Sequence, residues 1–331
     1  MAASKNKFLQ VVKYVLLFGL AILLVYLAFR KVDWDVFLTG LRQTRWVWVV
    51  LFLVASVVAL IGRVVRWREL LHPFDDSIGF GKVWDANNIG NLASAALPGT
   101  GEFLRCGYMS SKKLEFDKAL GTMLCERLWD FLAILALAIV VFLLQWDRFG
   151  GYFKENILVP LASAGAGWIL AVIVVAATVF IVTVFRLKDR SDFCRKVAES
   201  ISRLWAGITA FNKSKNKLLV ALTTMLIWFT YVVMCFCIIK AMPALDGLNL
   251  ADAAFLSLVG NIASVVPVPG GVGAYHYLVA AALGLYGHSW DTGILFATLN
   301  HEIHALLIIV LGIVSYINFV RKPLAKKADE N

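Results

Sequence analysis

The amino-acid sequence predicts an all-α integral membrane protein, and three observations lead to this fold class. Of 331 residues, 60% are hydrophobic and only 16% are charged. The mean hydropathy is +0.76, and several apolar stretches are long enough to cross a bilayer. Soluble domains are roughly 45–50% apolar and about 25% charged. The composition therefore excludes a soluble enzyme, a disordered chain and a fibrous protein.

About six transmembrane helices are expected, because crossing a hydrocarbon core of about 30 Å takes about 20 apolar residues. The stretches of that length are Phe8–Phe29, Trp46–Val65, Lys118–Leu144, Leu161–Phe185, Lys217–Ile239 and Asp291–Val320. The first follows two lysines, as a signal peptide would. Its apolar run exceeds the ~7–15 residues of a signal sequence and no small-residue cleavage site follows, so we expect a retained helix.

Two further apolar segments are interrupted by proline, glycine and asparagine. They are Val83–Leu104 and Asp252–Tyr286. Pro and Gly at this density end a helix. Backbone that is not helical is tolerated at membrane depth only inside protein or beside a wet cavity. We therefore predict two re-entrant hairpins.

The two hairpins resemble each other in sequence. The pentad Gly90–Ser94 matches Gly260–Ser264, and a Pro-Gly-rich element and then a span with polar residues follow each pentad. Three predicted spans lie between the hairpins, so the second enters from the opposite face. This pattern predicts an inverted repeat, with halves of about 46–150 and 217–320 inside one polytopic domain, 1–331.

The distribution of Lys and Arg predicts the orientation. With both termini cytoplasmic, 24 of the 32 basic residues lie on the cytoplasmic side and 6 outside, as the positive-inside rule requires. Segment 186–216 is then a basic cytoplasmic loop, and the protein lies in the inner or plasma membrane. No basic stretch stands apart from the apolar segments, so nucleic-acid binding is not expected.

Neither a metal site nor a cofactor is predicted. The five cysteines are odd in number and lack zinc-ligand spacing, so they read as small hydrophobic residues. The stretch Gly79–Lys82 lacks the spacing of a phosphate-binding P-loop, so this chain is not expected to bind ATP.

The main candidate site is a charged cluster in the third predicted span. Glu126, Arg127 and Asp130 lie on one helix turn and point roughly the same way. Three charges at membrane depth, each costing about 2.5–3.5 kcal/mol, need partners or water. The alternative is that this long helix protrudes and places the charges at the interface.

The tip of the first hairpin supplies further candidates. Gly99 and Gly101 would let backbone amides face an anion, and Arg105 could bind phosphate with its planar guanidinium. Glu102 lies three residues before Arg105 and could pair with it. The alternative is a tight turn followed by an arginine that reaches the headgroup region. Asn91 belongs to the pentad of this hairpin.

The corresponding candidates in the second half are polar residues of the second hairpin and of the last span. From the hairpin these are Asn261, Gly270, Gly271 and His276. The last span carries His301, Glu302 and His304, whose spacing differs from the His-Glu-x-x-His pattern of zinc proteases. These three are candidates for proton coupling, since His titrates near neutrality. The alternative is a polar network that only packs helices.

The sequence resembles the transmembrane, flippase-like region of lysylphosphatidylglycerol synthases and the stand-alone membrane proteins that share it. The resemblance rests on Leu97–Arg105, Glu126–Asp130 and Pro267–Gly273, and it covers about residues 8–320. It implies movement of lipid between leaflets. In that family lysyl transfer belongs to a separate soluble domain, which we do not expect here, because the sequence ends about ten residues after its last span. Ala274–His276 stands where relatives often carry an Arg-Glu pair.

We therefore expect a flippase or translocase for a phosphate-headgroup lipid, either a phospholipid or a polyprenyl-phosphate-linked lipid, not driven by ATP bound to this chain. Arg105 and Arg127 would bind the phosphate, and the neighbouring carboxylates would orient them or recognise a cationic headgroup. One alternative is a membrane-embedded transferase acting on a lipid-linked substrate. Another is a non-catalytic subunit whose charged cluster docks a membrane-protein partner.

Overall fold

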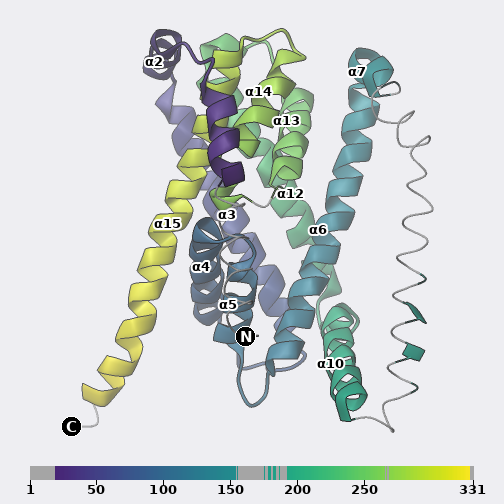
Figure 1. Ribbon diagram of the computed structural model, residues 1–331. Helices are drawn as coiled ribbons and strands as arrows, with labels where there is room; N and C mark the ends of the chain where they lie inside the picture. The colour runs from purple at the N-terminus through teal and green to yellow at the C-terminus, as the bar shows by residue number, and fades with distance from the viewer. Residues whose placement is uncertain are drawn as a thin grey trace, which may run out of the picture.

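The computed structural model describes residues 19–153, 192–264, 266 and 268–328, with isolated positions at 155, 175, 178, 179, 182, 183 and 186. The described residues are helical, with turns and no strand, so the all-α prediction is confirmed. Figure 1 shows an elongated bundle in which long helices surround two pairs of shorter ones.

Four described helices are long and apolar enough to cross a membrane. They are α3 (Trp46–Leu71), α6 (Phe116–Leu144), α12 (Lys217–Ala241) and residues Trp290–Arg321 of α15 (Trp290–Ala328). These four match predicted spans. A shorter apolar helix, Gly19–Phe29, is the described part of the first predicted span. The remainder of that span, 8–18, and the predicted span 161–185 lie outside the described ranges.

Helix α3 is longer than the predicted span that it contains. The predicted span ends at Val65, before Arg66, Arg68 and Glu69, but α3 continues to Leu71. Arg is a good helix former, and Arg66 and Trp67 are buried. Arg63 and Arg66, which the charge count places among the cytoplasmic basic residues, therefore belong to a transmembrane helix. Arg105 was counted in the same way and is also buried.

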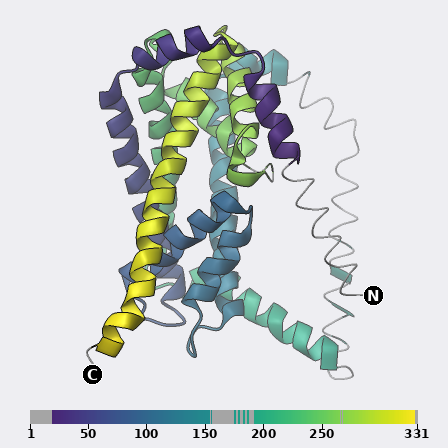
Figure 2. The ribbon, with the colours of Figure 1, turned by 60° about the vertical axis from the view of Figure 1, so that its left-hand side comes forward.

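Two pairs of short helices occupy the positions of the predicted hairpins. The first pair is α4 (Phe80–Ala96) and α5 (Thr100–Met109), and the second is α13 (Leu250–Ala263) and α14 (Ala274–Gly284). Their 10 to 17 residues correspond to about 15–26 Å at the helical rise, less than the hydrocarbon core. Figures 1 and 2 show the first pair in the lower half and the second in the upper half.

The turns of the two pairs meet near the middle of the bundle. The short helix η3 (Pro269–Gly271) packs against α4. The carbonyl oxygen of Ala95 lies 3.7 Å from the position that a Cβ of Gly270 would occupy. Gly99 and Gly270 have positive φ angles of 79° and 64°, which glycine adopts without strain. The bundle therefore contains two half-length helix pairs that approach from opposite ends.

A close backbone contact holds the first pair together. A Cβ on Gly101 would lie 1.8 Å from the carbonyl oxygen of Gly90. In the second pair, Gly260 makes room for a side chain instead, since a Cβ there would lie 2.6 Å from the ring of Tyr275. Gly90 and Gly260 are the first residues of the matching pentads. These contacts agree with the internal repeat, which remains a prediction.

Helix α15 packs against both pairs. Its upper part touches α14 at Gly293, where a Cβ would lie 2.9 Å from that of Ala280. Its lower part touches α4 at Gly312, where a Cβ would lie 2.6 Å from that of Leu92. Helix α12 packs along α3.

Polar contacts fix the ends of the long helices. At the upper end, Arg45 donates two hydrogen bonds of 2.7 Å to Asp246, and these bonds lower the pKa of the Asp246 carboxyl. The short helix α7 (Trp146–Phe153) follows α6 there, and Arg148 lies 3.0 Å from Asp252 of α13. Helices α2 (Trp34–Arg42) and η2 (Pro243–Leu245) lie at the same end.

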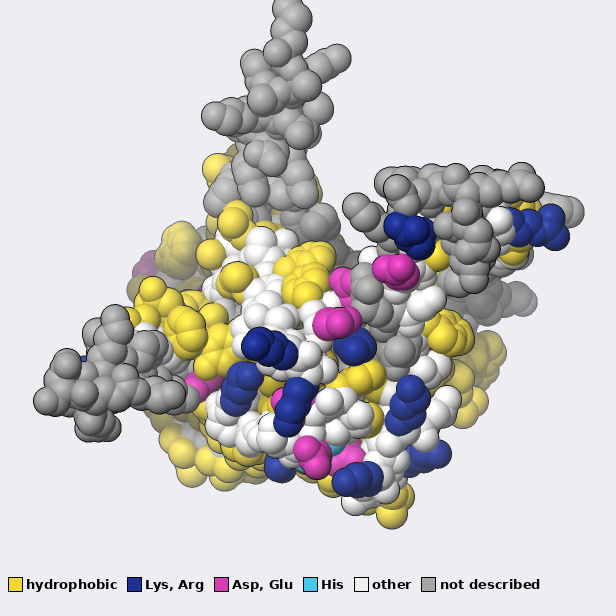
Figure 3. All heavy atoms as spheres, turned by 90° about the horizontal axis from the view of Figure 1, so that it is seen from below, with side chains coloured by type: hydrophobic (Ala, Val, Ile, Leu, Met, Phe, Trp, Pro, Cys, Tyr) yellow, Lys and Arg dark blue, Asp and Glu magenta, His cyan; other side chains and the backbone are white. Residues whose placement is uncertain are grey.

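The lower end carries the connections predicted to be cytoplasmic. Figure 3 shows Lys and Arg side chains spread over this end, with Asp and Glu among them. The segment predicted as a basic loop, 186–216, contains α10 (Asp192–Ile208) and α11 (Ala210–Lys213). Helix α10 packs against α6. The basic connections therefore lie together at one end of the bundle, as the charge distribution predicts. That this end faces the cytoplasm remains an expectation.

Labelling of single cysteines tests the re-entrant hairpin. In a background without the native cysteines, we expect Asp76→Cys and Lys112→Cys, before α4 and after α5, to react with an impermeant maleimide from the same side. Ala244→Cys should react from the opposite side. All three positions are exposed. Reaction of the first two from opposite sides would mean that 80–109 crosses the membrane.

A single methyl group tests the contact between α4 and α5. We expect Gly101→Ala to lower the midpoint of thermal unfolding in detergent, since overpacking costs about 1–3 kcal/mol. Gly107→Ala is the matched control: it lies in the same helix, and its Cβ would meet nothing within 4 Å. Equal midpoints for the two variants would show that the helices do not approach this closely.

Candidate functional site

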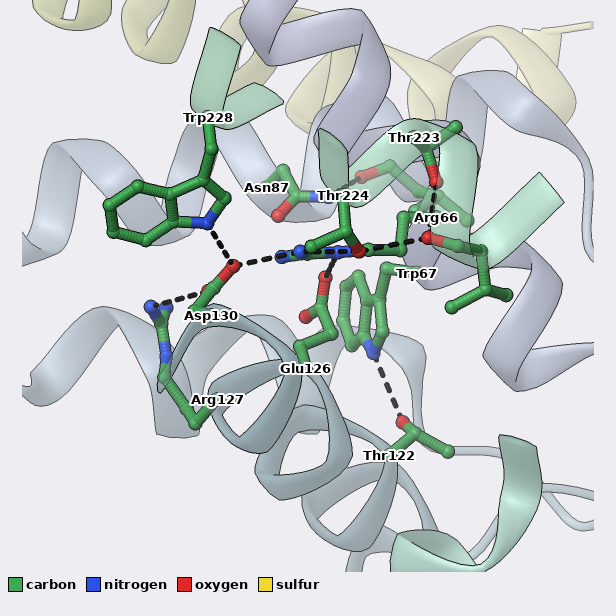
Figure 4. Close-up of polar contacts among 12 residues, drawn as sticks. Arg66, Trp67, Asn87, Thr122, Glu126, Arg127, Asp130, Thr223, Thr224 and Trp228 are labelled. Atoms are coloured by element: carbon green, nitrogen blue, oxygen red, sulfur yellow. Dashed lines mark hydrogen bonds and ion pairs between the residues drawn. The ribbon is translucent and has the colours of Figure 1, made fainter. Parts of the chain in front are cut away.

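Charged side chains from three helices meet inside the lower half of the bundle. Helix α3 contributes Arg66, α5 contributes Glu102 and Arg105, and α6 contributes Glu126, Arg127 and Asp130. We call these six residues the arginine–carboxylate cluster. Figure 4 shows Arg66 reaching across to Glu126 and Asp130 on α6.

Arg105 is fully engaged by its neighbours. Its Nε and Nη2 lie 2.7 Å from Glu102 Oε2, and Nη2 also lies 2.8 Å from Glu126 Oε2. Its Nη1 donates a hydrogen bond of 3.0 Å to Asn87 Oδ1. The guanidinium lies 4.4 Å over the ring of Trp67, a cation–π contact. Nε and Nη1 donate hydrogen bonds, whereas Nη2 takes part in ion pairs and has no hydrogen-bond partner among the described residues. Because two carboxylates and an amide already surround it, Arg105 mainly positions these groups.

Arg66 is held in the same way from the opposite side of Glu126. Its Nη1 lies 2.7 Å from Asp130 Oδ1, and its Nε lies 3.5 Å from Glu126 Oε1. The hydroxyl of Thr224 on α12 lies 3.3 Å from the same Nη1. Arg66 and Glu126 are only 1% and 2% exposed. Buried charges persist only when they are paired, and Glu126 is shared between two arginines, Arg66 and Arg105.

Arg127 and Asp130 form the outer rim of the cluster. Arg127 is paired with Glu102, and its Nη1 lies 3.3 Å from Asp130 Oδ2. The indole of Trp228 donates to Asp130 Oδ1 at 3.4 Å. The side chain of Arg127 is 44% exposed. The sequence prediction that Glu126, Arg127 and Asp130 face a common site agrees with this geometry.

A fourth arginine faces a cavity beside the cluster. Arg63, one helix turn before Arg66, lines a cavity of about 290 Å³ with Arg66, Arg127 and Asp130. Among the described residues, Arg63 has no hydrogen-bond or ion-pair partner. Four arginines therefore share three carboxylates, which leaves one excess positive charge beside the cavity. We call this space the arginine cavity.

The sequence analysis did not single out Arg63 or Arg66 as site residues, because both lie at the end of the predicted span Trp46–Val65, where basic residues are expected at the membrane surface. The signal was nevertheless present. Two arginines three residues apart follow the apolar run without a proline, and the only interrupting glycine, Gly62, is one that helices tolerate. Residues three apart lie on the same face of a helix, so this spacing places Arg63 and Arg66 together on the buried face of α3.

A second polar cavity lies next to the first, toward the upper half. It has a volume of about 230 Å³ and is lined by Asn261, Asn300, His301 and His304, among others. We call it the histidine cavity. Tyr231, Asn261 and Ser264 line both cavities, so the two are neighbours across these three side chains.

The histidines differ in their surroundings. His301 Nδ1 lies 2.9 Å from Glu302 Oε1, whereas His276 Nε2 lies 3.7 Å from the same oxygen. His276 is buried beside the ring of Phe29 and does not line either cavity. His304 lines the histidine cavity, and its Nδ1 is buried without a hydrogen bond within the described residues.

The predicted glycines and Asn91 lie outside both cavities. Gly99 and Gly101 form the turn and the helix contact described above. Gly270 and Gly271 form the turn before α14, and a Cβ on Gly271 would lie 3.3 Å from His301 Nε2. Asn91 has a buried side-chain nitrogen without a partner in the described part of the chain. The Arg105 counterpart 170 residues later is Tyr275, whose hydroxyl accepts a hydrogen bond from Asn300.

Comparisons with known proteins give one match. A family model described as Lysylphosphatidylglycerol synthase TM region matches residues 10–312, which is most of the chain and agrees with the resemblance seen in the sequence. No curated protein matches, and no solved structure matches.

The shared carboxylate can be tested through stability. We expect Glu126→Gln to lower the free energy of unfolding by about 3–5 kcal/mol, because Arg66 and Arg105 would then be buried with too little negative charge. The control is Glu115→Gln, whose side chain is 53% exposed and pairs with Lys118, a surface pair worth about 0–1 kcal/mol. Chemical unfolding in mixed micelles measures both, and equal losses would contradict the bridging role of Glu126.

Proposed function

The chain belongs to the lysylphosphatidylglycerol synthase TM region family, a family of membrane domains, and from this premise we propose that it moves a phosphate-bearing lipid headgroup between the two leaflets. It is a multi-pass membrane protein. The location that we propose is the cell membrane, with both termini on the cytoplasmic side.

The observation that carries the proposal is the uncompensated charge at Arg63. Paired arginines hold their places in the fold, but an arginine beside a cavity without a carboxylate partner is open to an anion. A guanidinium matches the geometry of a phosphate through two parallel hydrogen bonds. Arg127, which lines the same cavity and is partly exposed, supplies a second contact. The predicted phosphate ligand Arg105 is thus replaced by Arg63.

The position of the two cavities supports a route for the headgroup. They lie side by side at the lower end of α13, where Asn261 and Ser264, together with Tyr231 of α12, border both. Paired broken helices around a central binding site are characteristic of many secondary transporters. A headgroup that leaves the arginine cavity would next meet the polar groups of the histidine cavity.

The residues of the last span supply candidate groups for coupling to protons. His301 and His304 line the histidine cavity, and Glu302 accepts from His301. Imidazoles exchange protons near neutral pH. Movement of the headgroup then depends on a proton gradient, on a partner protein or on the lipid gradient alone.

The pairing of the charges favours the binding of an anionic headgroup over the two alternatives, a membrane-embedded transferase and a non-catalytic partner subunit. Glu102 and Asp130 accept hydrogen bonds from arginines, and Glu126 is ion-paired with two, so these carboxylates are not poised to take a proton from a substrate in a transferase. A docking surface for a partner subunit would present its charges outward, whereas Arg66, Arg105 and Glu126 are buried.

Translocation in liposomes tests the proposal. With fluorescent phosphatidylglycerol and a membrane-impermeant quencher, we expect the purified protein to accelerate exchange between leaflets. Arg63→Gln should slow it about 10–150-fold, the factor that corresponds to a lost hydrogen bond to a charged group of ~1.5–3 kcal/mol. The fold should survive this change, because it removes an unpaired charge.

The matched control is Arg42→Gln, which changes an exposed arginine of α2 at the upper end and should leave the rate unchanged. Equal rates for Arg63→Gln and wild type would remove Arg63 from the binding site. The translocase proposal would be refuted if the wild-type protein failed to accelerate the exchange of any phosphate-bearing lipid, both with and without an imposed proton gradient.

A further inference from the structure

A long apolar groove lies beside the arginine cavity. It runs between α6, α12 and the start of α13 and has a volume of about 670 Å³. On α6 its lining follows one stripe of the helix, from Trp129 through Ala133, Ala136 and Val140 to Leu144. At the helical rise this stripe is about 22 Å long, which is most of the thickness of the hydrocarbon core.

The groove exists because α6 and α12 diverge. Helix α12 packs closely along α3, whereas its contact with α6 is sparse. Small side chains on both walls, Ala136 on α6 and Ala221 on α12, widen the space between them. The walls are almost entirely apolar, so the groove suits a hydrocarbon chain rather than a headgroup.

The groove and the arginine cavity are neighbours along α12. Trp228 lines both spaces. Thr224 lines the groove, and its hydroxyl receives a hydrogen bond from Arg66. Figure 4 shows Trp228 and Thr224 pointing toward Asp130 and Arg66. An apolar groove therefore lies next to a cavity with excess positive charge, on either side of Trp228.

We propose that the groove holds an acyl chain of the lipid whose phosphate lies in the arginine cavity. This proposal rests on the proposed function for the identity of the headgroup and adds the place of the tail. The chemistry identifies the occupant, since an anionic headgroup covalently joined to a long apolar chain matches both spaces at once. The groove also extends upward from the cavity, so a tail can follow the headgroup along α6 without leaving an apolar environment.

Photolabelling tests the tail site without any transport. The probe is phosphatidylglycerol with a diazirine in one acyl chain, and the matched probe is diacylglycerol with the same chains. We expect the phosphate-bearing probe to label 129–144 and 221–232 at least fivefold more than diacylglycerol does. At the exposed residues Leu306 and Val310 of α15, which contact bulk lipid, the two probes should label equally.

Two variants sharpen the test. Ala136→Trp fills the groove and should abolish the phosphate-dependent labelling and slow translocation at least tenfold. Ala281→Trp makes the same change on an exposed position of α14 that lines neither the groove nor a cavity, and it should change neither readout.

The possible outcomes distinguish a failure of the proposed acyl-chain site from a failure of the proposed translocase function. Equal labelling of the groove by both probes, or cross-linking of an Ala136→Cys variant to a cysteine placed in 161–185, would overturn the tail site, whatever the transport result. Translocation that persists in Ala136→Trp would likewise overturn it and leave the translocase standing. Phosphate-dependent labelling without translocation would confirm the tail site and refute the proposed function.

Discussion

The placement of Glu126 between two arginines is the constraint on which the interior of this protein depends. Its carboxylate faces Arg66 of α3 on one side and Arg105 of α5 on the other. In a medium of low polarity an unpaired charge is far more costly than in water. The helices that carry the three groups are therefore fixed relative to one another. One carboxylate links a full-length span, a half-length helix and α6, which supplies it.

The same requirement, that polar groups within the membrane have partners, governs the half-length helices. A turn within the membrane is tolerated only where protein or water satisfies its backbone, and here each turn faces the turn of the opposite pair. Glycines make this possible by different means. Gly99 and Gly270 adopt positive φ angles, whereas Gly101 leaves room for a neighbouring carbonyl oxygen. The result is polar space in the middle of the bundle with apolar helices around it.

Much of this arrangement could be predicted from the sequence. Apolar length located the long spans, and the density of Pro and Gly located the two pairs of short helices. Helical spacing placed Glu126, Arg127 and Asp130 on a common face. These features depend on residues close together in the chain, so a local pattern is sufficient to detect them.

What could not be predicted depends on distant partners. Arg66 belongs in a transmembrane helix only because Glu126 and Asp130, some 60 residues later, neutralise it, and hydropathy counts it as the end of a span. The distinction between the engaged Arg105 and the unpaired Arg63 likewise requires the positions of all the carboxylates. Gly101 was interpreted as part of an anion-binding turn, because nothing local reveals that Gly90 lies against it.

The packing of α15 has a mechanical consequence. This helix of 39 residues is close-packed against α14 through Gly293 and against α4 through Gly312. One continuous helix therefore connects the two half-length pairs. Packed interfaces shift between discrete arrangements rather than deforming smoothly. Rocking of the upper pair is therefore transmitted to the lower pair unless α15 bends or slides at one glycine contact. For the proposed translocase, this coupling would close the path to one leaflet as the path to the other opens.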